Sequence, residues 1–113
     1  MNKLSEILTG FKSFSFPVEF DHVKTGTKSP FAEYTFETSD NFDADDVVFC
    51  PRALVELRVF MSDLDAALLT EIESFFRTNE ISWSRSQPQY YEETGAFEVD
   101  YTFGCLDDTA GGI

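Results

Sequence analysis

The stretch Leu54-Val-Glu-Leu-Arg-Val-Phe60 decides the fold, because its side chains alternate between apolar and charged. Successive side chains of an extended chain point to opposite faces, so the two valines share one face with Leu57, and Glu56 and Arg58 share the other. Valine, leucine and phenylalanine also suit a pleated, half-buried surface. The stretch therefore predicts a strand with one buried face, and the other elements are expected to pack around it.

The chain after this strand predicts one long amphipathic helix from Ser62 to about Thr78. Ser62 is a suitable N-cap, and the carboxylates of Asp63 and Asp65 complement the positive end of a helix dipole. Apolar residues then recur at helical spacing. They are Leu64, Leu68, Leu69, Ile72, Phe75 and Phe76. This apolar stripe is expected to lie on one face of the sheet.

The C-terminal third predicts a hairpin. Residues 81–87 alternate around Trp83, and residues 97–103 place aromatic and aliphatic side chains opposite Glu98 and Asp100, with a turn near residues 92–95 between them. The segment from about 106 to 113 is polar and rich in glycine, so we expect it to be disordered or ordered only by a partner.

The N-terminal part supplies shorter elements. Residues 3–9 have helical spacing and are followed by Gly10, which predicts a short helix that ends there. Val18 and Phe20 fit a short strand, and residues 31–36 alternate after Pro30, a residue that is tolerated at a strand start. Residues 47–50 are also predicted to be extended.

The order of these elements predicts an α+β fold in a single domain over residues 1–113. We expect a mostly antiparallel sheet with one long helix packed on one face, a short N-terminal helix and a C-terminal hairpin. A domain of this size buries a modest core. The chain has 18 aromatic residues, 13 of them Phe, and some of these are expected to face a partner.

The charge is strongly acidic, with 8 basic and 21 acidic residues and a net of −13. Residues 1–30 carry four lysines against three acidic residues, so nearly all of the negative charge belongs to the remainder. Binding to nucleic-acid phosphates needs clusters of Lys and Arg, and the sequence has none. A solvated acidic surface alone also accounts for such a charge. No apolar run approaches the ~20 residues that span a bilayer, so we expect a soluble, intracellular protein with no membrane contact.

The sequence predicts no enzyme, cofactor or metal site. The one histidine, His22, stands outside any known catalytic or zinc-binding motif, and Cys50 and Cys105 are too far apart for a paired-cysteine motif. We expect both thiols to be free and buried. Residues 40–46 are rich in Asp, but neither register has the Gly and Glu that a calcium loop requires. Incidental cation binding there stays open.

Phe42 lies in the middle of this acidic loop. A large apolar side chain flanked by acids either packs on its own core or anchors in a neighbouring subunit. Basic residues nearby would pair with acidic groups of that neighbour. The candidate residues of a subunit or tube interface are Asp40, Asn41, Phe42, Asp43, Asp45, Arg52 and Arg58.

Several short segments, taken in order, carry a resemblance to a known family. They are Phe16–His22, Ser29–Phe36, Ser39–Asp46, Val55–Phe60 and Ile81–Arg85. Over residues 16–103 the chain resembles the tail terminator, or tail completion, proteins of phages and prophages with long, non-contractile tails. It departs from that pattern at Ala32 and Glu33 and at Cys50-Pro51.

The resemblance implies a structural virion protein, assembled in the bacterial host cytoplasm, with no reaction to catalyse. Identical copies would form a ring, a homo-oligomer of six, at the head-proximal end of the tail. The ring would end the polymerisation of the major tail tube protein and join the tail to the head-tail connector or head-closure protein. DNA would pass through the lumen without specific binding, and an acidic wall would repel its phosphates.

Two other functions are also compatible with the sequence. A head-closure or neck component of the same virion shares the size and ring symmetry of a tail terminator. An inhibitor that mimics DNA would use the acidic charge to block a nuclease or repressor, although the acids are spread over all predicted elements. A small enzyme would need an unrecognised carboxylate site.

Overall fold

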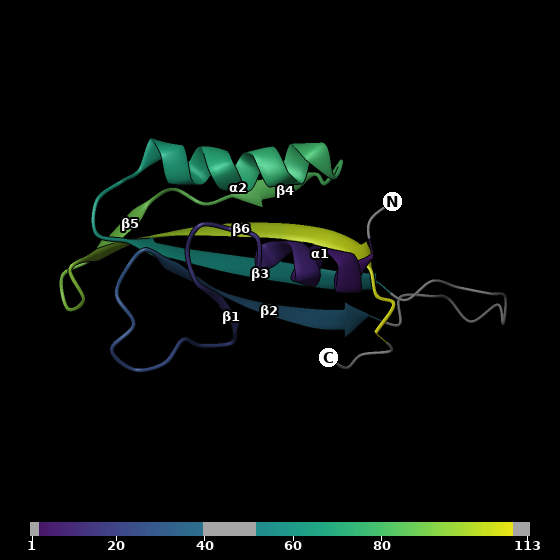
Figure 1. The fold of residues 1–113 in the computed structure, drawn as a ribbon, viewed down its shortest axis with the longest axis horizontal. Coiled ribbons are helices and arrows are strands. Elements are labelled where there is room, and N and C mark those ends of the chain that lie inside the picture. The colour runs from purple at the N-terminus through teal and green to yellow at the C-terminus, as the bar shows by residue number, and fades with distance from the viewer. Residues whose placement is uncertain (1–2, 40–51, 110–113) are drawn as a thin grey trace, which may run out of the picture.

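The computed structural model describes residues 3–39 and 52–109, and Figure 1 shows their course. They form an α+β fold with two helices and a mixed, six-stranded sheet. The elements are α1 (Leu4–Phe11), β1 (Val18–Phe20), β2 (Phe31–Ser39), β3 (Arg52–Met61), α2 (Ala66–Thr78), β4 (Trp83–Arg85), β5 (Gln89–Tyr91) and β6 (Ala96–Leu106). The predicted α+β class is confirmed.

The strand order is β1-β2-β3-β6-β4, and β5 pairs with a separate part of β6. β1 runs parallel to β2, and every other described pair is antiparallel. β3, the strand that the alternating sequence predicts best, lies in the middle and pairs with β2 and β6 over most of its length. Its burial alternates as predicted, with Val55, Leu57 and Val59 fully buried.

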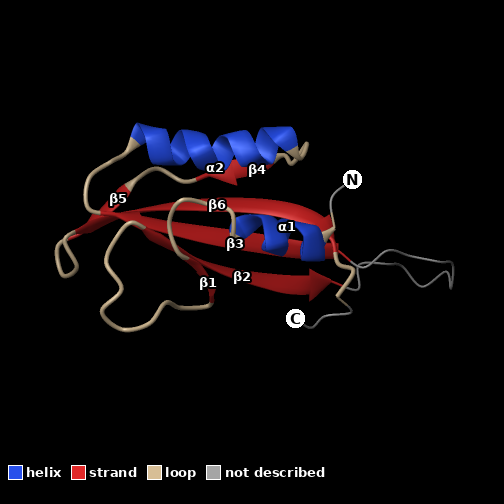
Figure 2. Ribbon diagram, viewed as in Figure 1, coloured by secondary structure: helices blue, strands red, loops and turns tan. Residues whose placement is uncertain are grey.

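Both helices cover the same face of the sheet, and the core lies between them and the strands (Figure 2). Phe11 of α1 connects the layers, because its ring contacts Phe75 of α2 at a centroid distance of 5.9 Å and Phe103 of β6 at 6.5 Å. The aliphatic stripe of α2 is buried on the same side through Leu68 and Ile72. One sheet face is therefore packed, and the other has no described helix over it.

The prediction of one long helix was wrong, since α2 has 13 residues and begins at Ala66. Its N-cap is Asp65, whose side chain accepts hydrogen bonds from the backbone of Ala67 (3.0 Å) and Leu68 (3.2 Å). Ser62, the predicted cap, instead lies 2.7 Å from the hydroxyl of Ser29. β3 continues to Met61, so residues 62–64 are needed for the turn from strand to helix.

The predicted end of the first helix was also displaced. α1 continues through Gly10 to Phe11, and Gly10 allows a close approach to α2 instead of ending the helix. β6 likewise extends beyond the predicted strand to Leu106. Asp107 is buried and accepts a hydrogen bond from the Thr38 hydroxyl at 2.6 Å, and Asp108 accepts one from the Ser5 amide at 2.9 Å. The described part of the expected tail, up to residue 109, is thus bonded to the fold.

The predicted pairing of residues 81–87 with residues 97–103 is present as β4 and β6, but β5, a strand that was not predicted, lies between them in the chain and forms the hairpin with β6. In the turn of that hairpin Gly95 has a φ of +65°, a conformation that suits glycine. β4 pairs with a later part of β6, where Trp83 lies opposite Phe103. The Trp83 ring packs on Phe76 of α2 at 5.3 Å, and the Arg77 guanidinium lies 5.5 Å from its centre. These contacts hold α2 over the edge of the sheet.

Candidate functional site

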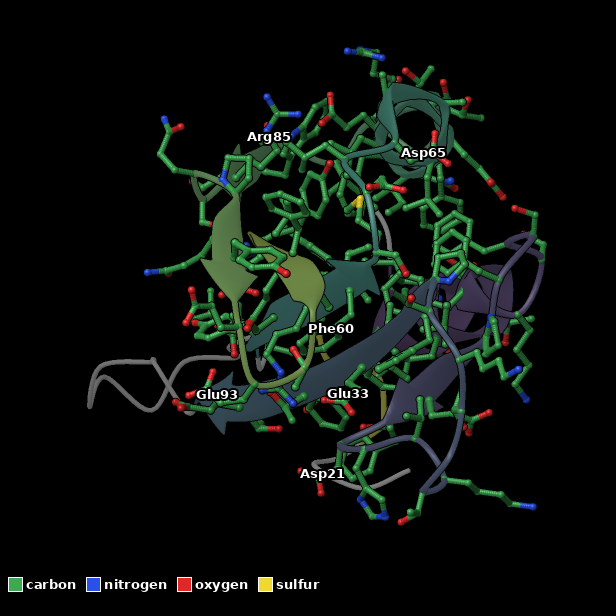
Figure 3. All side chains as sticks on the ribbon, turned by 90° about the vertical axis from the view of Figure 1, so that its left-hand side faces the viewer. Asp21, Glu33, Phe60, Asp65, Arg85 and Glu93 are labelled. Carbon is green, nitrogen blue, oxygen red and sulfur yellow. The ribbon has the colours of Figure 1, made fainter. Side chains whose placement is uncertain are left out.

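The sheet face turned away from both helices, which we call the open face, holds most of the charged strand residues. Figure 3 shows Glu33 on the opposite side of the sheet from Asp65, the cap of α2. The open face consists of Phe31, Glu33, Thr35, Glu37, Arg52, Leu54, Glu56, Arg58, Phe60, Glu98, Asp100, Thr102 and Leu106. Its apolar and charged groups alternate, so it resembles neither a hydrophobic core nor a fully solvated surface.

Arg58 forms the centre of the open face. Its guanidinium lies 3.3 Å from the Glu33 carboxylate on β2 and 3.5 Å from the Glu56 carboxylate on its own strand. It also donates to the backbone carbonyl of Asp21 at 3.1 Å, and the Val23 amide donates to Glu33 at 3.3 Å. Because the Arg58 and Glu33 side chains are only 26% and 17% exposed, these contacts hold the segment after β1 onto the sheet.

Two acidic side chains of β6, Glu98 and Asp100, lie close together beside Arg58. Burial, and then the hydrogen bond and negative charge of Asp100, raise the pKa of Glu98 to about 7, while Arg58 acts in the opposite direction. One oxygen of Asp100, Oδ1, is buried without a donor among the described residues. A protonated Glu98 can donate to Asp100, whereas an ionised one cannot. Glu98 therefore holds its proton up to about neutral pH.

The structure describes only some of the predicted interface residues. Asp40, Asn41, Phe42, Asp43 and Asp45 lie outside the described residues. Arg52 and Arg58 share the open face, but six residues along a strand separate them by about 20 Å. The Arg52 side chain is exposed and lies over Gly104, within 3.2 Å of where a Cβ on that glycine would be. Arg58 is thus engaged within its own chain, and Arg52 forms no ion pair with a described residue.

The sequence did not identify Glu33, Glu98 or Asp100 as neighbours of Arg58. The alternation in residues 97–103 does place Glu98 and Asp100 opposite the apolar face. Their proximity to Arg58 depends on the register of β3 against β6, which pairs Arg58 with Asp100, and of β2 against β3, which pairs Glu33 with Arg58. Neither register can be read from a single alternating segment.

The described residues contain no group of three or more His, Cys, Asp and Glu arranged to hold a metal ion. His22 is exposed and lies 3.0 Å from Asp21, its neighbour in sequence. Cys105 is buried, and burial raises the pKa of its thiol to about 11, which makes it a poor nucleophile. Within residues 3–39 and 52–109, no helix combines the length and apolar character needed to cross a bilayer.

Comparison with known proteins found no family model that matches the chain and no curated protein with significant similarity.

Proposed function

We propose that this protein is a structural subunit of a phage tail, which assembles as a ring of identical copies at the head-proximal end of the tail tube. The ring ends the polymerisation of the major tail tube protein and joins the tail to the head connector. The chain performs no reaction in this role. Support comes from the resemblance of residues 16–103 to tail terminator proteins and from the character of the open face.

The open face is the observation that carries the proposal. Phe31 and Phe60 stack there with ring centroids 5.1 Å apart, and Leu54 is 54% exposed. Apolar side chains interspersed with arginine and carboxylates are typical of the interfaces of soluble subunits. The helices pack on only one side of the sheet, so a second surface remains for contacts between subunits.

The acidic charge suits a channel for DNA. The net charge is −13, and duplex DNA carries about one negative charge per 1.7 Å. A basic lumen would bind and retard the genome during its passage, and an acidic lumen repels it. The same charge opposes the approach of subunits, so close contacts must place basic groups against acidic ones.

Electron microscopy of the purified protein, together with a tube-capping assay, tests the proposal. The expected images show rings with a central hole, and addition of the protein to growing tail tubes should stop their elongation. A protein that stays a single particle at every ionic strength and leaves tube growth unchanged is not a tail terminator.

A head-closure or neck component would give similar rings, and the capping assay separates the two roles. A head-closure protein should bind the isolated connector and leave tube growth unaffected. A DNA mimic fits the open face less well, because Arg58 lies within 3.5 Å of both the Glu33 and the Glu56 carboxylates and neutralises part of their charge.

A further inference from the structure

A cavity of about 630 Å³ lies at the end of the sheet where β2 begins and β3 ends, and we call it the end pocket. The stacked rings of Phe31 and Phe60 line it from the two strands. The pocket also contains Lys28 and four hydroxyl side chains, among them Thr27 and Thr94. It therefore offers a large aromatic contact surrounded by hydrogen-bond donors.

The charge of the end pocket favours an anionic occupant. Lys28 is exposed and forms no ion pair with a described residue, and the same holds for Lys24 in the same loop. Glu33 is the one carboxylate among the residues that line the pocket, and Arg58 and the Val23 amide already bind it. An acidic segment with an aromatic side chain would match both the lysines and the phenyl rings.

The chain itself contains such a segment, Asp40-Asn-Phe-Asp-Ala-Asp-Asp46, with four carboxylates around Phe42. This segment cannot reach the end pocket of its own copy. β2 has nine residues between Phe31 and Ser39, so its ends are about 26 Å apart. Phe42 follows Ser39 by three residues, which extend at most about 11 Å. The remaining distance is longer than a phenylalanine side chain.

We infer that residues 40–46 of one copy dock in the end pocket of the next copy, with Phe42 against Phe31 and Phe60 and the carboxylates beside Lys28. The inference rests on the proposed ring, whose subunit contact it specifies. The contact joins opposite ends of the sheet, so it is heterologous. Contacts of this kind close into rings when the rotation between copies allows it.

Photo-crosslinking tests the contact directly. The photoreactive analogue p-benzoylphenylalanine replaces Phe42, unlabelled and isotope-labelled copies are mixed, and mass spectrometry identifies the crosslinked residues. The expected crosslinks join different copies, from position 42 to residues 27–31, 60–62 or 94–96. Crosslinks between copies at other positions, or crosslinks only within one copy, overturn the inference. If light scattering still shows an oligomer in that case, the proposed ring is unaffected. A monomer without crosslinks removes both proposals.

A charge swap tests the electrostatic part. Lys28→Glu should weaken self-association on the order of tenfold, because it places a carboxylate against the acidic segment. The matched control is Lys12→Glu, which changes the net charge equally at the exposed end of α1 and should have at most a twofold effect. Adding Asp43→Lys or Asp45→Lys to the Lys28→Glu chain should restore association. Equal losses from both lysine variants, or no recovery with either added lysine, contradict the docking.

Discussion

Gly10 of α1 lies so close to Phe75 of α2 that a Cβ on residue 10 would be only 2.5 Å from Cε1 of the phenyl ring. Cβ atoms essentially never approach another heavy atom so closely. The ring cannot easily move away, because it also packs against Phe11 at 5.9 Å and Phe14 at 5.2 Å. The absence of a side chain at residue 10 therefore sets how closely the two helices approach over the sheet.

Gly10→Ala should destabilise the protein by about 1 to 3 kcal/mol, the usual cost of overpacking a core. A loss of stability would be informative, because in an isolated helix alanine is more favourable than glycine by about 1 kcal/mol. Urea unfolding followed by circular dichroism measures the change. In a Phe75→Leu background the smaller side chain relieves the clash, so Gly10→Ala should be neutral or stabilising there. A loss of equal size in both backgrounds rules out the ring as the cause.

Asp65→Ala should lower the free energy of unfolding by about 1 kcal/mol, because it removes the acceptor for two amides in the first turn of α2. Asp63→Ala is the control, since Asp63 is exposed and precedes the helix, and it removes the same charge. Thermal unfolding at neutral pH compares the variants. An equal loss from both substitutions would point to a general effect of charge and not to capping.

Arg58→Gln should cost about 2 kcal/mol of stability, because it leaves the Glu33 carboxylate partly buried without its cation. Arg52→Gln should change stability by less than about 0.5 kcal/mol, as is usual for an exposed side chain, since Arg52 has no charged partner among the described residues. Denaturant midpoints measure both. If Arg52 takes part in subunit contacts, its variant should weaken assembly while the fold stays intact. The reverse pattern, with Arg52 the more costly for folding, would contradict these assignments.

The raised pKa of Glu98 makes stability depend on pH. The folded protein holds this proton up to about pH 7, whereas the unfolded chain releases it near pH 4.5. The contribution is therefore complete below about pH 4.5 and is lost as the pH rises to 7. Relative to the native sequence, Glu98→Gln should raise the free energy of unfolding more at pH 8 than at pH 4.5. The difference between the two pH values should be about 1 kcal/mol once solvent screening is allowed for.

The control for this pH effect is Glu93→Gln, which removes an equal charge from the exposed turn between β5 and β6. Unfolding curves at several pH values should show a pH-dependent difference from the native sequence for Glu98→Gln and none for Glu93→Gln. A parallel shift of both variants would indicate that net charge, and not the pair formed with Asp100, governs the response.

Self-association should strengthen as salt rises from low to moderate concentration. Each copy carries a net charge of −13, so the copies repel one another. This repulsion acts over longer distances than the attraction between opposite charges that are in direct contact. At about 0.1 M salt the Debye length is about 10 Å, so the repulsion is largely screened. Light scattering across a salt series measures the mass. Dissociation as salt is added, or a monomer throughout, would count against the ring.

The alternating sequence of residues 54–60 was sufficient to predict the central strand, since Val55, Leu57 and Val59 are fully buried as the alternation requires. The start of α2 was harder, because Ser62 and Asp65 are both competent caps and the choice depends on how far β3 extends. The parallel pairing of β1 with β2 had no sequence signal, because three residues are too few to show a period.

The candidate site was less predictable than the fold. Arg58 was identified as a charged residue opposite the buried face, but its partners Glu33 and Asp21 come from other segments of the chain. The end pocket likewise joins residues near position 28 to the turn at Thr94, which only the folded sheet brings together. Such groupings depend on strand register, and register is a property of the whole sheet.

The position of β6 has a consequence for synthesis on the ribosome. This strand pairs with β3, β4 and β5 and supplies Val99, Tyr101 and Phe103 to the core, yet it comes after every other described element in the chain. The core of the nascent polypeptide stays incomplete until β6 has emerged. Chaperones are therefore expected to hold the unfinished chain during translation, and release of the completed polypeptide should trigger folding.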